Sequence, residues 1–229
     1  MQNDYSGLLV VNKPVGITSF KLVSIIKKKL QVKKVGHCGT LDPLASGLML
    51  ILIDKATKLQ DNFMKKDKVY LASVKLGMKT NSGDLDGKII SQSDYSHVDI
   101  DKIKKVCDSF IGEIEQIPPM FSALKVGGKK LYELARKGIE IERKKRKIKI
   151  YFIDVLNFSD GIIDMRVKCS SGTYIRTLAE DIGKQLNTDA VLSNLVREEI
   201  DEYLLNQSIS LSDMESNEKE FILNKIIKI

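Results

Sequence analysis

The sequence predicts an α+β fold, in which a mostly antiparallel or mixed sheet is flanked by helices. Short apolar runs bounded by Gly and Pro outnumber the helical patterns. Two of these runs bracket Ser159-Asp160-Gly161, which is a hairpin signal. The runs also do not alternate regularly with helices, as a parallel βαβ array requires. With 229 residues, 43% of them hydrophobic, the chain can bury a sizeable core, and we expect one domain over residues 1–229.

In chain order, the first half predicts four strands and three helices. The strands are residues 7–12, 48–53, 69–76 and 88–91, and the helices are residues 19–30, 56–64 and 99–110. The first helix can be capped by Thr18 or Ser19. The spacing of its apolar residues predicts one buried face, formed by Phe20, Val23, Ile26 and Leu30.

The second half begins with a basic excursion at residues 119–146, which contains a short helix at 131–137. Two hairpin strands follow at 148–158 and 162–169, and then a helix at 174–186. An apolar, mixed cluster occupies residues 190–196, and residues 218–229 predict an amphipathic helix.

A glycine-rich loop at residues 36–47 is the first candidate for chemistry. Its Asp42 lies between Leu41 and Pro43, where the proline stiffens the backbone. The segment from Tyr5 to Leu41 contains seven lysines and no acid. A single carboxylate on a rigid loop in basic surroundings suits catalysis, and a simple turn aspartate is the alternative.

Basic charge is concentrated in one segment. Residues 125–149 hold eleven Lys and Arg against three Glu, a net charge of +8, whereas the remainder holds 26 basic and 27 acidic residues. Such a concentration favours a nucleic-acid partner over a merely solvated lysine-rich surface. Residues 198–221 carry eight acids and one lysine, so we do not expect them to contact phosphates.

Several kinds of site are not indicated. The three cysteines are scattered without a C-x-x-C pair, and two histidines cannot build a His-rich metal site. The sequence contains no Rossmann or Walker-type phosphate motif, so we expect neither a metal nor an organic cofactor. The N-terminus resembles no secretion signal, and no apolar run is long enough for a membrane span. We expect a cytoplasmic protein.

Five motifs, read together, resemble the TruB-type tRNA pseudouridine synthases in both order and spacing. The resemblance covers roughly residues 7–197. The motifs are N-K-P-x-G at 12–16, G-H-x-G-T-L-D-P-L-A-S-G at 36–47, K-x-Y at 68–70, Q-I-P-P-M-F-S-A-L-K at 116–125 and S-G-T-Y-I-R-T at 171–177.

This resemblance implies a pseudouridine-synthase fold and an RNA-modifying isomerase. The family cleaves the N1–C1′ glycosidic bond of a uridine and re-attaches the uracil through C5. Its bacterial members act on position 55 in the TΨC loop of tRNA. We therefore expect the T stem-loop of tRNA as partner, no protein partner and a monomer. A tRNA-binding folding chaperone with secondary catalysis is the alternative.

By the same resemblance, Asp42 is the catalytic carboxylate, which either attacks C1′ or removes a 2′ proton. Arg176 pairs with Asp42, and Tyr70 stacks on the target base and accepts the C5 proton. The resemblance also assigns four residues to substrate binding: His37, which reaches into the T loop, Tyr174, Lys13 and Leu195.

Residues 119–146 correspond to the family's RNA-binding thumb. Its predicted contacts are basic: Lys125, Lys129, Lys130, Arg136, Arg143, Lys144, Lys145 and Arg146. Two departures stand out. Asn81 replaces an acid in the loop at 80–87, and the chain ends where many relatives continue into a C-terminal PUA RNA-binding domain. We expect this domain to be absent, so that the grip on RNA comes from the catalytic domain and thumb.

Overall fold

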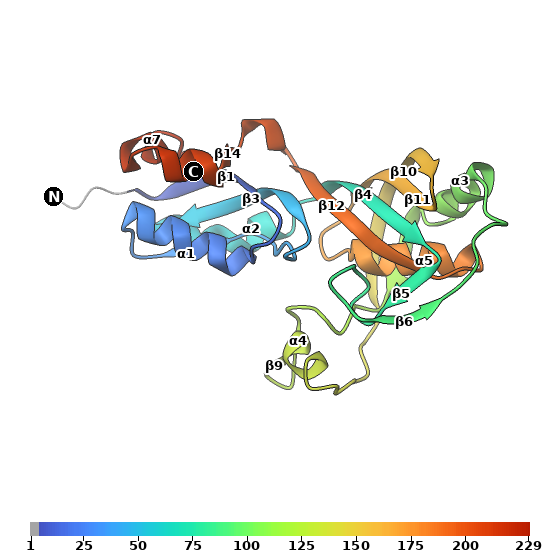
Figure 1. Ribbon diagram of the computed structural model, residues 1–229. Coiled ribbons are helices and arrows are strands. Elements are labelled where there is room, and N and C mark those ends of the chain that lie inside the picture. The colour runs from blue at the N-terminus through green and yellow to red at the C-terminus, as the bar shows by residue number, and fades with distance from the viewer. Residues whose placement is uncertain (1–4) are drawn as a thin grey trace. The chain divides into compact units, whose positions relative to one another are not determined.

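The computed structural model describes residues 5–229, which form two compact units (Figure 1). Unit 1 contains residues 5–70 together with Val196–Ile229, and unit 2 is Leu71–Leu195. Strands β4 (Lys68–Leu76) and β12 (Ala190–Ile200) contribute residues to both units. Because the sheet contains parallel and antiparallel pairs and helices flank it, the predicted α+β class with a mixed sheet is confirmed.

Unit 1 is built on the strand order β14-β1-β3-β12, with β2 on β3 and β13 on β12. Strands β1 and β3 are antiparallel, whereas β14 joins β1 and β12 joins β3 in parallel. The strands are β1 (Gly7–Lys13), β2 (Val35–His37), β3 (Ser46–Ile53), β13 (Tyr203–Leu204) and β14 (Ile209–Ser210). The helices are α1 (Ser19–Leu30), η1 (Asp54–Leu59), α2 (Gln60–Met64), η2 (Leu205–Gln207), α6 (Leu211–Ser216) and α7 (Lys219–Leu223).

Both faces of β1 and β3 are buried, which explains their continuous apolar sequence. One face joins Leu8, Val10 and Leu50 to Ala56 of η1 and Phe63 of α2 in a single cluster. Helix α1 lies beside β2 and α7. The loop between β2 and β3 is thereby attached to the core of unit 1 at both of its ends.

Unit 2 has the strand order β12-β4-β11-β10-β7, where β7 is Gly112–Gln116, β10 is Arg146–Ser159 and β11 is Ile162–Cys169. The predicted hairpin is confirmed, because Ser159 pairs with Ile162 across a turn whose Asp160 and Gly161 both have positive φ. Helices α3 (Ile100–Ser109) and α5 (Ile175–Gln185) belong to this unit. Strands β5 (Met78–Thr80) and β6 (Ile89–Gln92) form a separate antiparallel pair.

The basic excursion leaves unit 2 after β7 and returns at β10. Gln116 pairs directly with Arg146, so its two ends are neighbours in the sheet. It contains a two-stranded hairpin, β8 (Lys125–Val126) with β9 (Lys129–Lys130), and helix α4 (Leu131–Ala135). We refer to residues 119–146 as the thumb.

Two helix predictions need correction. The predicted apolar face of α1 is wrong at Phe20, which is 77% exposed; the buried face is Leu22, Ile26 and Leu30, one turn apart on the helix. The predicted helix at 218–229 is only α7, which ends at Leu223. Beyond it, Ile227 and Leu8 exchange two backbone hydrogen bonds, both 2.8 Å long. Pairing with β1 therefore replaces the helical hydrogen bonds that the amphipathic pattern predicted.

Candidate active site

The loop that carries Asp42 is held in place by the turn and helix that follow β1. Ser19, at the start of α1, accepts a hydrogen bond from Leu41 N (2.9 Å) and donates one to Leu41 O (2.8 Å). Pro43 O accepts from Gly16 N at 2.8 Å, and Asp42 O accepts from Ala45 N at 3.1 Å. The backbone on both sides of Asp42 is therefore fixed, while its side chain is half-buried.

Two buried cations lie near this carboxylate in unit 1. Lys13 is fully buried, and its Nζ donates to Pro14 O and Ile17 O, both at 2.8 Å. Arg197 is 1% exposed and donates to Leu48 O (2.7 Å) and Gly39 O (3.2 Å). Burial lowers the pKa of Lys13 to about 8; the charge of Asp42 acts to raise this pKa and that of Arg197 to lower it. We call Lys13, Asp42 and Arg197 the charge cluster.

His37 ends β2, just before the Asp42 loop. Its carbonyl oxygen accepts a hydrogen bond from Gln60 Nε2 at 2.9 Å, which ties it to α2. Burial, together with the charge of Arg197, lowers the pKa of the imidazole, whereas a hydrogen bond with the Gly39 backbone acts to raise it. Within residues 5–229, His37 Nδ1 is buried without a hydrogen-bond partner. A neutral imidazole is suited to stacking on a nucleobase rather than to pairing with phosphate.

Tyr70, the last residue of unit 1 before the chain enters unit 2, is 9% exposed in β4. Two residues earlier on the same strand, Lys68 is buried and donates to Met64 O and Lys66 O. Unit 1 thus contains the predicted residues Lys13, His37, Asp42 and Tyr70, while unit 2 contains Tyr174, Arg176 and Leu195.

In unit 2, Arg176 is 5% exposed in the first turn of α5. It donates to Ser82 O (2.8 Å) and Phe121 O (2.7 Å), and its Nε lies 3.7 Å from Asp84 Oδ2. Asp84 is itself buried and accepts from Ser82 Oγ at 2.5 Å. The sequence analysis did not single out Asp84 as a partner of Arg176, although it recognised the turn-rich loop that contains Asp84. The pairing of Arg176 with Asp42 stays a prediction.

The remaining predicted residues are held by unit 2 as well. The backbone of Tyr174 is clamped by the Gln116 side chain, which accepts from Tyr174 N (3.0 Å) and donates to Tyr174 O (3.2 Å). Leu195 is 7% exposed in β12. Asn81, the departure noted in the sequence, accepts from Lys88 N at 2.9 Å. Its amide oxygen therefore closes the loop at 80–87 in the way a carboxylate oxygen could.

The thumb displays most of its predicted basic residues to solvent. Lys130 and Arg136 lie over the ring of Tyr132, 5.5 and 5.4 Å from its centroid. Lys130 and Arg143 are only half-exposed, and Arg143 also donates to Pro118 O (3.2 Å) and Glu140 Oε1 (2.8 Å). The exposed predicted residues are Lys125, Lys129, Arg136, Lys144, Lys145 and Arg146.

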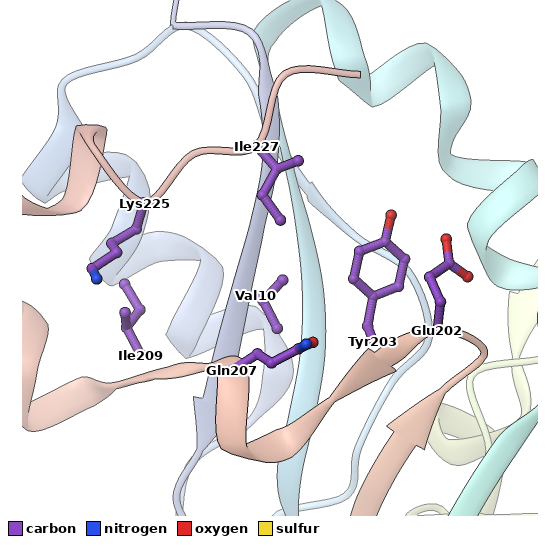
Figure 2. Close-up of a pocket in the computed structure, with 7 residues that line it drawn as sticks. All are labelled: Val10, Glu202, Tyr203, Gln207, Ile209, Lys225 and Ile227. Atoms are coloured by element: carbon purple, nitrogen blue, oxygen red, sulfur yellow. The ribbon is translucent and has the colours of Figure 1, made fainter.

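A pocket of about 420 Å³ lies in unit 1, and none of the residues predicted for the site lines it (Figure 2). Three of its residues, Val10, Ile209 and Ile227, are apolar, and its polar lining residues are Glu202, Tyr203, Gln207 and Lys225. Among the described residues, no group of three or more His, Cys, Asp or Glu side chains is placed to hold a metal ion. None of the helices within residues 5–229 is long and apolar enough to cross a membrane.

Comparison with known proteins places these features in a family context. A family model described as "TruB family pseudouridylate synthase (N terminal domain)" matches residues 27–175. The chain is 55% identical to tRNA pseudouridine synthase B of Endomicrobium trichonymphae, covering 99% of this chain and 98% of that protein. It is 47% identical to tRNA pseudouridine synthase B of Clostridium kluyveri, covering 97% of this chain and 76% of the relative.

Solved structures agree with this result. A chain in the crystal structure of a Cbf5-Nop10-Gar1 complex matches with a TM-score of 0.72 and 31% identity. The match covers 97% of this chain and 60% of that chain. A chain of the archaeal box H/ACA sRNP Nop10-Cbf5 complex matches with a TM-score of 0.69 and 26% identity, covering 96% of this chain and 58% of that one.

Proposed function

The chain belongs to the TruB family of pseudouridylate synthases, and we propose that it converts uridine 55 in the TΨC loop of tRNA to pseudouridine. It is a tRNA pseudouridine synthase, an isomerase. The observation that best supports the finer proposal is the charge cluster, in which one half-buried carboxylate on a fixed loop interacts with a buried cation.

The reaction breaks the N1–C1′ bond, which develops positive charge at C1′. Asp42 is the group that acts on the ribose, either by attacking C1′ or by removing the 2′ proton. Both routes need a carboxylate at a fixed distance from the sugar, and the hydrogen bonds from Ser19 and Gly16 to the loop supply that rigidity. Lys13 supports the loop through its bonds to Pro14 and Ile17.

The uracil must leave the RNA stack to be reached, and the other predicted residues have roles in that step. Tyr70 stacks on the extruded base and accepts the C5 proton after re-attachment. Tyr174 and Leu195 line the pocket for the base, and His37 fills the place that the base leaves in the T loop. The lowered pKa of His37 supports this role, because a neutral ring can stack without a charge to desolvate.

Arg176 pairs with Asp42 in the catalytic complex, and Asp84 sets the direction of the guanidinium. A carboxylate near Nε leaves the two terminal nitrogens for other acceptors, which here are Ser82 O and Phe121 O. Because Phe121 belongs to the thumb, the arginine links the base of the thumb to α5. The exposed thumb residues bind phosphates of the T stem-loop.

The test is Asp42→Asn, assayed by tritium release from tRNA labelled at uracil C5. We expect turnover to be lost and tRNA binding to be nearly unchanged, because the amide keeps the shape of the side chain but not its charge. Asp61→Asn, an exposed acid of α2 in the same unit, is the matched control and should turn over normally. Turnover by Asp42→Asn would contradict the assignment of Asp42 as the catalytic carboxylate.

A further inference from the structure

Arg197 is the largest fully buried side chain among the described residues, yet no motif of the sequence analysis includes it. A guanidinium stays charged at any working pH, and burying it is unfavourable unless its donors and its charge are both compensated. The burial of Arg197, two positions after Leu195, therefore requires groups that compensate its donors and its charge.

The hydrogen bonds of Arg197 explain its burial. Arg197 donates from Nε to Leu48 O and from Nη2 to Gly39 O, at 2.7 and 3.2 Å. These two carbonyls flank the loop that contains Asp42, one before it and one after it. One rigid, planar side chain therefore fixes both ends of this loop to strand β12.

The backbone around Arg197 is fitted to the same loop. In the parallel pair of β12 with β3, Arg197 lies opposite Gly47. A Cβ on Gly47 would fall 2.4 Å from Arg197 O and 2.6 Å from Arg197 N, so the two strands approach closely only because residue 47 is glycine. This close contact fixes the backbone of Arg197 next to the end of the loop.

The charge of Arg197 also acts on the cluster. It lowers the pKa of Lys13 and that of His37, one on each side of the loop, whereas the Asp42 carboxylate raises the pKa of Lys13. Arg197 and Asp42 therefore share Lys13 as a common electrostatic neighbour. A buried positive charge at this place favours the ionised form of a carboxylate.

We propose that Arg197 is a positioning residue for Asp42, which holds both ends of residues 39–48 at a fixed distance from β12. This inference rests on the proposed function, because it assigns Arg197 a part in the same reaction. It does not touch the substrate. Its loss moves the carboxylate relative to the ribose, so it slows the chemical step and leaves tRNA binding almost intact.

Two substitutions test the proposal by single-turnover kinetics with excess enzyme. Arg197→Met keeps the length of the side chain but removes charge and hydrogen bonds, and we expect its rate at saturation to fall by about 100-fold. Arg197→Lys keeps the charge but not the two-pronged donor, so its rate should lie between those of Arg197→Met and the wild type. The dissociation constant for tRNA should change little in both.

Leu30→Ala separates positioning from general destabilisation. Leu30 is fully buried at the C-terminal end of α1 in the same unit, at the opposite end of the helix from Ser19, which binds the loop. This variant should therefore melt earlier and still react at the wild-type rate below its melting temperature. The proposal fails if Arg197→Met and Arg197→Lys react at the wild-type rate. It also fails if the loss of rate in all three variants, Leu30→Ala included, follows the loss of stability, because Arg197 is then only structural.

An NMR titration of His37 tests the placement of the Arg197 charge without relying on activity. The sequence has two histidines, so the His37→Gln variant assigns both ring signals. Arg197→Met should raise the pKa of His37, and Arg197→Lys should leave it low. If the wild-type protein forms no pseudouridine, the proposed function fails, while this titration still decides whether Arg197 acts on the loop; an unchanged pKa in Arg197→Met would contradict it.

Discussion

At the scale of single residues, Lys13 shows how burial changes the chemistry of a lysine, here at the end of strand β1. Its ammonium donates to two carbonyls of the next turn and has an electrostatic interaction with Asp42. The motif resemblance indicated that Lys13 supports the active-site loop, but full burial of a lysine cannot be predicted from a single sequence, in which lysine is normally exposed. The depressed pKa of Lys13 makes its environment measurable.

The pH dependence of stability is the first prediction. Between pH 8 and 10.5 the unfolded chain binds a proton at Lys13 and the folded chain does not, so this group's contribution to the unfolding free energy rises with pH there. The gain is about 2–3 kcal/mol across the window. Chemical denaturation measures the unfolding free energies of the wild type and Lys13→Met at pH 8 and pH 10.5. The wild-type value minus the Lys13→Met value should increase by this amount between the two pH values. Lys28→Met, an exposed lysine of α1, is the control; parallel curves for the wild type and Lys13→Met would contradict the prediction.

The two residues that sequence reasoning missed, Asp84 and Arg197, share a physical cause. Each is a charged residue that the fold buries against an opposite charge or carbonyls distant in sequence. Neither has a spacing that marks it, because the partners belong to other elements. Asp42 was found because its neighbours in sequence, Leu41 and Pro43, already describe its rigid loop. A site residue can be predicted from the sequence where its neighbours along the chain define its environment. It cannot be predicted in this way where its environment is formed by tertiary contacts.

At the scale of elements, β12 carries the largest difference between expectation and structure. The sequence predicted an apolar, mixed cluster at 190–196, and the strand runs from Ala190 to Ile200 through an acidic stretch. Its pairing with β3 is parallel and non-local, which no local pattern encodes. The hairpin of β10 and β11 was predictable, in contrast, because Asp160-Gly161 encodes the turn itself.

The contact between β3 and β12 gives the second prediction, Gly47→Ala. Gly47 has a φ of +105°, and the added methyl would meet the Arg197 backbone at 2.4 Å. We expect a loss of about 3 kcal/mol or more in unfolding free energy, from strain and overpacking together. Gly112→Ala is a matched control, because its φ is +109° with no atom within 4 Å of the new Cβ, so it suffers backbone strain only. Urea denaturation should rank Gly47→Ala as clearly less stable; equal losses would show that the strands separate freely.

At the scale of the whole molecule, charge is distributed unevenly along the chain. Residues 125–149 carry a net +8, while everything else sums to −1. The structure adds that this charge lies mostly in an excursion whose ends, Gln116 and Arg146, are paired in the sheet. The strands on either side of the thumb therefore pair directly in the sheet of unit 2. The exposed side chains of the thumb remain available to bind a polyanion.

The salt dependence of tRNA binding is the prediction that follows. Replacing residues 144–147 with Gln removes four exposed charges and leaves Arg143, which is bonded to Pro118 and Glu140, in place. The slope of log affinity against log salt should become shallower by up to about 3–4, because each lost phosphate contact releases one counterion fewer. Filter binding of tRNA across a salt series measures the slope. Lys104→Gln with Lys105→Gln, exposed lysines of α3, should leave it unchanged. An unaltered slope in the 144–147 variant would show that the phosphates are bound elsewhere. The rate at saturating tRNA, which we propose to depend on Asp42, should stay close to that of the wild type.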